Sequence, residues 1–163
     1  MKKLTTPISD EEILSLDVGD QVYISGEIFT GRDAALPQLV ELIKENKLDF
    51  NIEGSAIMHT AVSDAGIAPT TSNKEEIEST IPFLSKNGVK IHIGKGMLHE
   101  DTIVSLKENN SIFVITPPVA ALLTSKVLKK ECVAFSNEGM EAMYKLEVEN
   151  IPGIVAVSNG RSI

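Results

Sequence analysis

An arginine near the start of this 163-residue chain stands in a setting suited to binding an anion. Arg32 follows Gly31, just after an alternating β-type stretch and where the next helix should begin. A helix N-terminus leaves backbone N–H groups unpaired and carries partial positive charge, so an added guanidinium could bind a carboxylate or a phosphate. Taken alone, the feature favours a simpler interpretation, in which Arg32 pairs with a nearby acid and closes a turn.

A second cationic side chain lies in Gly94-Lys95-Gly96, which follows another predicted strand. Two glycines would let the backbone approach a ligand closely, and Lys95 could point toward an anion. The upstream glycine spacing and the Lys-Ser/Thr pair of a P-loop are absent from this segment. In isolation, a glycine-rich turn with a solvated lysine is the favoured interpretation.

Hydroxyl groups gather in a polar stretch, residues 62–73, which has no apolar period and is rich in Ser, Thr, Gly, Asp and Pro. We expect an exposed loop there, and loops of this size are often functional. Thr70, Thr71 and Ser72 could bring a hydroxyl to a substrate, although such a group needs a neighbouring charge to activate it. The alternative is a pair of local side-chain turns, which are common in loops.

The histidines and the single cysteine show no metal-ligand spacing. His59 and His92 stand among apolar residues in predicted strands, which favours interior or edge histidines with satisfied hydrogen bonds. Cys132 cannot form an internal disulfide, and alone it cannot hold zinc or an iron–sulfur cluster. Its apolar neighbours indicate a buried, inert thiol.

Composition and charge favour one soluble domain over residues 1–163. Hydrophobic residues make up 42% of the chain, enough for one core, and only 4% are aromatic, so the core must be aliphatic. The net charge of −8, without a long Lys/Arg cluster, argues against nucleic acid as a partner. The N-terminus lacks a signal-peptide core and no apolar run approaches the ~20 residues of a membrane span, so we expect a cytoplasmic protein without membrane contact.

Hydrophobic periodicity and turn residues predict alternating strands and helices. We expect strands over residues 21–28, 55–61, 89–93, 112–115, 132–135, 142–148 and 154–157. We expect helices over residues 10–16, 34–46, 80–87, 99–108 and 119–130. Strands and helices that alternate with short joins indicate the α/β class.

Four blocks, in this order, give the chain a specific resemblance. They are Gly-Arg-Asp-Ala-Ala at 31–35, Pro-Thr-Thr-Ser at 69–72, Ile-Gly-Lys-Gly at 93–96, and the long block from Gly139 to Gly153. Together they resemble the β subunit, or C-terminal domain, of class I, iron–sulfur-dependent fumarate hydratase, a family that includes the L(+)-tartrate dehydratase β subunit. The resemblance spans nearly the whole chain. Its last block is the most specific and has no obvious catalytic logic, which indicates a structural signature.

The resemblance implies a single three-layer, swivelling β/β/α domain and a hetero-oligomeric enzyme. A partner α subunit would carry a [4Fe–4S] cluster, and this chain would bind no cofactor itself. The implied reaction is the reversible hydration of fumarate to L-malate, a small dicarboxylate. We expect the isolated chain to be inactive, because the Lewis acid that the reaction needs would lie on the partner.

The resemblance also assigns roles to residues. Arg32 and Lys95 match substrate-binding positions, and Thr70 matches the threonine near the proton that is abstracted. Lys74 stands where the family usually has an arginine, which keeps the charge but loses the bidentate fork. Leu36 stands where a histidine is common. These departures leave two alternatives open: dehydration of L(+)-tartrate or a related hydroxydiacid, and a non-catalytic assembly or ligand-binding module.

Overall fold

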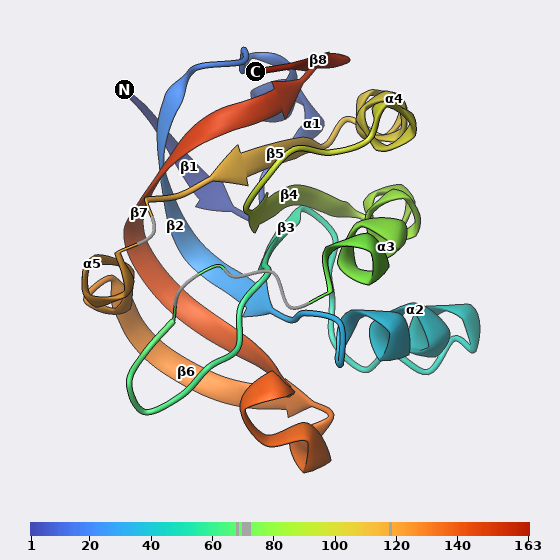
Figure 1. The fold of residues 1–163 in the computed structure, drawn as a ribbon, viewed down its shortest axis with the longest axis vertical. Coiled ribbons are helices and arrows are strands. Elements are labelled where there is room, and N and C mark those ends of the chain that lie inside the picture. Colours follow the sequence, from blue (N-terminus) through green and yellow to red (C-terminus); the bar gives the residue numbers. More distant parts are fainter. Residues whose placement is uncertain (68, 70–72, 118) are drawn as a thin grey trace.

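The computed structural model describes residues 1–67, 69, 73–117 and 119–163, and its centre is an eight-stranded mixed sheet (Figure 1). The strands are β1 (Lys2–Thr6), β2 (Gln21–Thr30), β3 (Ser55–Met58), β4 (Val89–Gly94), β5 (Ile112–Ile115), β6 (Val127–Ala134), β7 (Met143–Ser158) and β8 (Arg161–Ser162). The helices are α1 (Asp10–Leu14), α2 (Leu36–Lys44), α3 (Lys74–Lys86), α4 (Glu100–Glu108), α5 (Ala120–Thr124) and the 3₁₀ helix η1 (Ser136–Glu141). The α/β prediction is confirmed.

The sheet closes on itself through its longest strand, β7. Strands β2, β3, β4 and β5 are parallel neighbours, and β7 runs antiparallel to both β2 and β5. The resulting five-stranded barrel has an aliphatic interior, as the composition requires, and burial of this apolar surface is its main stabilising force. Fully buried side chains from its strands include Ile24, Ile28, Met58, Ile91, Ile93, Val114, Leu146, Ile151 and Val155.

Three helices cover one outer face of the barrel and complete the β/β/α layering. Helices α2, α3 and α4 lie side by side along that face (Figure 1). Leu36 and Leu39 of α2 pack with Ile77 and Leu84 of α3 against the strands. Ile81 of α3 belongs to a further cluster with residues of α4 and β5. Helix α3 therefore contacts the sheet at its centre, next to the carboxyl ends of β3 and β4.

Helix α3 begins six residues earlier than predicted. Its N-cap is Asn73, whose side-chain oxygen accepts a hydrogen bond from the Glu76 N–H at 3.4 Å. The prediction placed Pro82 in the first turn because proline is favoured there, but Pro82 lies inside the helix. As a consequence Lys74, which lay between the predicted loop over residues 62–73 and the predicted helix, is the first residue of α3.

The predicted helix over residues 119–130 is wrong in its second half. Helix α5 ends at Thr124, and β6 follows and pairs antiparallel with β7. The ladder places Lys129 opposite Glu147 and Glu131 opposite Lys145, so cross-strand pairing overrides the helical spacing. β6 is the outermost strand on its side of the sheet, and Cys132 on this strand is exposed. The prediction of a buried thiol is therefore also wrong.

The sequence also missed strand structure elsewhere. β7 is one strand through residues 143–158, where two had been predicted, because its pairing with β2 continues across Pro152 and Gly153. β1 and β8 were not predicted. Among the described residues, no helix is long and apolar enough to cross a membrane.

Candidate functional site

The carboxyl ends of the parallel strands meet at one edge of the barrel and carry the predicted cationic residues. Arg32 follows β2, His59 follows β3 and Lys95 follows β4. Backbone hydrogen bonds hold these ends in line: the Gly31 N–H donates to the Met58 carbonyl at 3.1 Å, and the His59 N–H donates to the Ile93 carbonyl at 2.8 Å. In α/β sheets, ligands bind outside the carboxyl ends of the strands.

The sequence suggested that a helix begins at Arg32, but α2 starts four residues later, at Leu36. The Arg32 carbonyl accepts hydrogen bonds from the Ala35 N–H at 3.2 Å and the Leu36 N–H at 2.9 Å, which closes a turn. Its guanidinium pairs with Glu141: Nε donates to Oε1 at 3.1 Å and Nη2 donates to Oε2. This hydrogen-bonded carboxylate raises the pKa of Arg32 above its ordinary value. The simpler interpretation, a paired arginine beside a turn, is confirmed.

Lys74 and Lys95 lie together, one at the start of α3 and the other directly after β4. Both line a narrow crevice between α3 and the sheet, with His59 and Glu78. The crevice has a volume of about 10 Å³, which is room for no more than a water molecule. The crevice itself is therefore too small to hold a dicarboxylate.

The two glycines that flank Lys95 lie close against neighbouring side chains. A Cβ on Gly94 would lie 2.7 Å from His59 Nδ1. Gly96 has a φ of +81°, and a Cβ there would lie 3.3 Å from both Cε and Nζ of Lys74. The motif thus sets the spacing between Lys95, His59 and Lys74.

Glu78 is a buried carboxylate that the sequence analysis did not single out. It lies on α3, and its Oε2 accepts hydrogen bonds from the His99 N–H and from Thr102 Oγ1, both at 2.7 Å. These bonds fix the start of α4 against α3. Its Oε1 has no hydrogen-bond partner among the described residues. The signal that could have revealed it is an acidic residue on the inner face of a helix that begins at Lys74.

Two buried histidines lie behind the lysines. His92 Nε2 is 2.7 Å from Ser85 Oγ, and His59 Nε2 has no partner within the described part of the chain. Burial lowers the pKa of His59 to about 4, and burial together with the charge of His59 lowers the pKa of His92 to about 3. The prediction that both histidines lie in the interior is correct. The prediction that their hydrogen bonds are satisfied is wrong for His59, which lines the crevice and whose Nε2 has no partner among the described residues.

These histidines predict a loss of stability in mild acid. Their folded-state pKa values lie below the ordinary 6.5, so the unfolded chain binds protons that the folded chain excludes. Stability should therefore fall as the pH drops from 6.5 toward 4, by about 2 kcal/mol per histidine at pH 5. Urea unfolding at pH 7 and pH 5 should show a smaller difference in His59→Gln than in the wild type.

His99→Gln is the matched control, because His99 is exposed and its pKa is raised by hydrogen bonding to Glu75. A raised pKa favours the folded state as the pH falls, so removing His99 should not reduce the loss of stability between pH 7 and pH 5. An unchanged pH difference in His59→Gln would contradict the assignment of a neutral, buried imidazole.

The predicted catalytic residue, Thr70, lies outside the described residues, as do Thr71 and Ser72. Arg32 lies on the same sheet edge as the two lysines but does not line their crevice. In the part of the chain that the structure describes, no three His, Cys, Asp or Glu side chains gather as a metal site. The arrangement offers an arginine fork that is paired with Glu141 after β2, and two ammonium groups, one at the start of α3 and one after β4.

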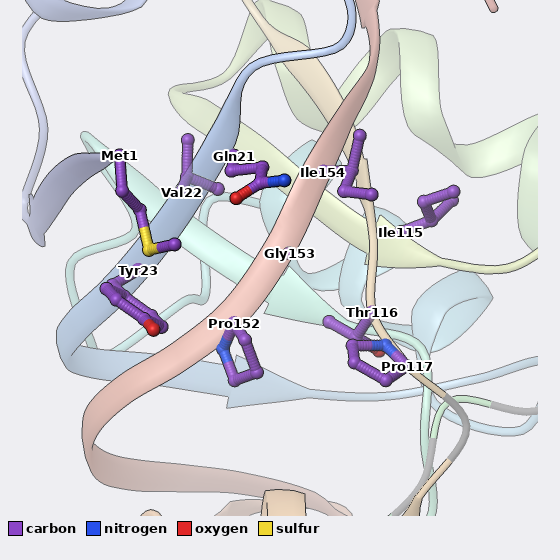
Figure 2. A pocket seen from close by; sticks show the side chains of 10 residues that line it. All are labelled: Met1, Gln21, Val22, Tyr23, Ile115, Thr116, Pro117, Pro152, Gly153 and Ile154. Atoms are coloured by element: carbon purple, nitrogen blue, oxygen red, sulfur yellow. The ribbon is translucent and has the colours of Figure 1, made fainter.

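A larger pocket lies elsewhere and has a different character. It has a volume of about 360 Å³ and is bounded by the amino end of β2, the end of β5 and the middle of β7 (Figure 2). Its lining is mostly apolar and holds no charged side chain: Met1, Gln21, Val22, Tyr23, Ile115, Thr116, Pro117, Pro152, Gly153 and Ile154. Because this lining is mostly apolar and none of its described side chains is cationic, the pocket suits a dianion less well than the carboxyl ends of the strands, where Arg32 and Lys95 lie.

Comparison with known proteins agrees with the sequence resemblance. Residues 2–163 match the family described as Fumarase C-terminus. The L(+)-tartrate dehydratase subunit beta of Escherichia coli K12 is 31% identical over 96% of this chain and 83% of its own length. A Methanocaldococcus jannaschii protein, provisionally given the same name, is 34% identical over 96% of this chain and 87% of its own length. A provisionally named class I fumarate hydratase of Geobacillus stearothermophilus is 30% identical over 98% of this chain, which spans 33% of that relative.

Proposed function

The chain belongs to the Fumarase C-terminus family, and from this membership we propose that it is the β subunit of a hydro-lyase that hydrates fumarate reversibly to L-malate. One observation on this chain's own residues supports the proposal. Arg32, Lys74 and Lys95 come from three separate segments and stand at one sheet edge, which is where a dianionic substrate needs positive charge.

The chemistry of the substrate explains why several cations are needed. A C4 dicarboxylate carries two negative charges at opposite ends, so one contact cannot fix its orientation. An arginine fork can hold one carboxylate in a defined plane, while a lysine supplies a less directional charge for the other. We assign carboxylate binding to Arg32, Lys74 and Lys95, and the position near the abstracted proton to Thr70.

The family resemblance implies a division of labour with a partner subunit, and the cysteine content of this chain agrees with it. A [4Fe–4S] cluster requires several cysteines, and the chain has one, Cys132, which is exposed on β6. A single cysteine cannot hold such a cluster, so we place the cluster on the α subunit, where it would act as the Lewis acid toward the substrate hydroxyl. We also place the assembled enzyme in the cytoplasm.

A second substrate has specific support. Two of the relatives named above carry the name L(+)-tartrate dehydratase subunit beta. By the family resemblance, Lys74 also stands where the family usually has an arginine. L(+)-tartrate is also a C4 dianion, with one more hydroxyl group than malate. The same cations would serve it, and the difference would lie in the groups that meet that hydroxyl.

The decisive experiment is the activity of the complex that this chain forms with its partner. The tagged chain would be used to capture the complex from its native extract under strict anaerobiosis, and fumarate, L-malate and L(+)-tartrate would be offered in parallel. We expect fumarate hydration, with iron and sulfide in the same fraction. Turnover of tartrate alone would select the second substrate, and binding of dicarboxylates without any turnover would leave only a non-catalytic module.

A further inference from the structure

The block from Gly139 to Gly153 is the most specific feature of the sequence, and the structure shows that it delivers one carboxylate to Arg32. Glu141 ends the 3₁₀ helix η1, just before β7. Its Oε1 accepts from Arg32 Nε at 3.1 Å, and its Oε2 accepts from Nη2. The two side chains retain exposed fractions of 16% for Arg32 and 27% for Glu141, so solvent screens the pair only in part.

The backbone on both sides of Glu141 is anchored to the barrel. The Val62 N–H donates to the Met140 carbonyl at 2.9 Å, and the Ala142 N–H donates to the Gly139 carbonyl at 3.0 Å. On the other side, the Tyr144 N–H donates to Oγ1 of the fully buried Thr30, at 3.2 Å. Ala142 itself is buried. The backbone around Glu141 is thus hydrogen-bonded to the end of β2, through Thr30, and to the segment that follows β3, through Val62.

Arg32 is anchored to the same strand ends. The preceding residue, Gly31, is bonded to the end of β3, and the Arg32 carbonyl is bonded by the first residues of α2. Both backbones of the pair are therefore tied to one rigid edge. A guanidinium held through Nε and Nη2 by a fixed carboxylate has its plane defined, because the side-on pair is bidentate.

We propose that Glu141 is a positioning residue for Arg32, setting the plane in which the guanidinium meets a substrate carboxylate. The proposal rests on the proposed function, in which Arg32 binds the dicarboxylate. Because the Arg32–Glu141 pair carries no net charge, Arg32 supplies direction, while Lys74 and Lys95 supply the net charge that attracts the dianion. The opposite arrangement, with Glu141 as a competitor that occupies Arg32 against the substrate, would require a carboxylate that leaves when substrate arrives.

Kinetics of the assembled complex separate these possibilities. We expect Glu141→Gln to lower kcat/KM about 10-fold and Glu141→Ala about 10²-fold, since loss of a positioning contact misorients the substrate. Glu138→Gln, three residues earlier in η1, is the matched control and should behave as the wild type. A merely structural role predicts that the isosteric Gln variant retains full activity, and a competing role predicts a lower KM; either result overturns the proposal.

A second measurement does not depend on activity. The chain has only two arginines, Arg32 and Arg161, so the Nε–H region of a ¹⁵N-labelled sample should contain two signals. We expect the Arg32 Nε–H to exchange slowly with water in the wild type and in Glu138→Gln, and much faster in Glu141→Ala. Equal exchange in the wild type and Glu141→Ala would overturn the pairing itself.

The two measurements also distinguish this proposal from the proposed function. A wild-type complex that converts no C4 acid would defeat the proposed function, and the positioning role would fall with it even if the Arg32 signal were protected. An active complex in which Glu141→Ala is as fast as the wild type would defeat the positioning role and leave the function standing.

Discussion

Replacing Arg32 by alanine is expected to lower kcat/KM of the assembled enzyme by about 10²-fold or more, because the substrate loses the contact that orients one carboxylate. The expected loss exceeds that of removing a single lysine, since a lysine charge near the same edge remains. Steady-state kinetics with fumarate and L-malate would measure it. Arg32→Lys should fall between the wild type and Arg32→Ala, because lysine keeps the charge without the fork.

The chain supplies a matched control for this substitution. Arg161 is the only other arginine and lies exposed on β8, away from the strand ends. Arg161→Ala should retain wild-type kinetics. The thermal stability of both variants must be compared, because Arg32→Ala also leaves Glu141 without its ion pair. Near-normal turnover in a well-folded Arg32→Ala complex would remove Arg32 from the site.

Most of the parallel sheet could be predicted from the sequence, because its strands carry the aliphatic pattern of a buried barrel. Residues 89–93 and 112–115 match β4 and β5 closely for this reason. The failures lie where long-range pairing decides the structure. The first half of β6, residues 127–130, has a spacing that suits a helix, and its pairing with β7 makes it part of the strand that had been predicted only over residues 132–135.

The candidate site was predicted as separate residues, without the geometry that connects them. The family resemblance pointed to Arg32, Lys74 and Lys95, and the structure adds that Lys74 and Lys95 share a crevice. The partner of Arg32 lies 109 residues away, a distance in sequence at which no local pattern can indicate contact. His59 was predicted inside a strand over residues 55–61, and only the end of β3 at Met58 places it at the carboxyl end of that strand.

The closing glycine of the long block, Gly153, is expected to be important for stability. Gly153 lies in β7 at the seam where this strand pairs with both β2 and β5 (Figure 2). A Cβ there would lie 2.4 Å from Val114 Cγ1 and 3.1 Å from the Ile115 carbonyl oxygen. Gly153→Ala should therefore destabilise the chain by about 1–3 kcal/mol through overpacking, measured by urea unfolding.

A double-mutant cycle tests the cause of that loss. Val114 is fully buried, so it cannot swing away from a new methyl group, but Val114→Ala would remove the clashing Cγ1. Each single variant should be destabilised, one by overpacking and the other by a cavity, and the double variant should be more stable than their sum predicts. Glu149→Val, at an exposed position of the same strand, controls for a general effect of altering β7. Additive losses would show that contact with Val114 Cγ1 is not the source of the Gly153→Ala loss.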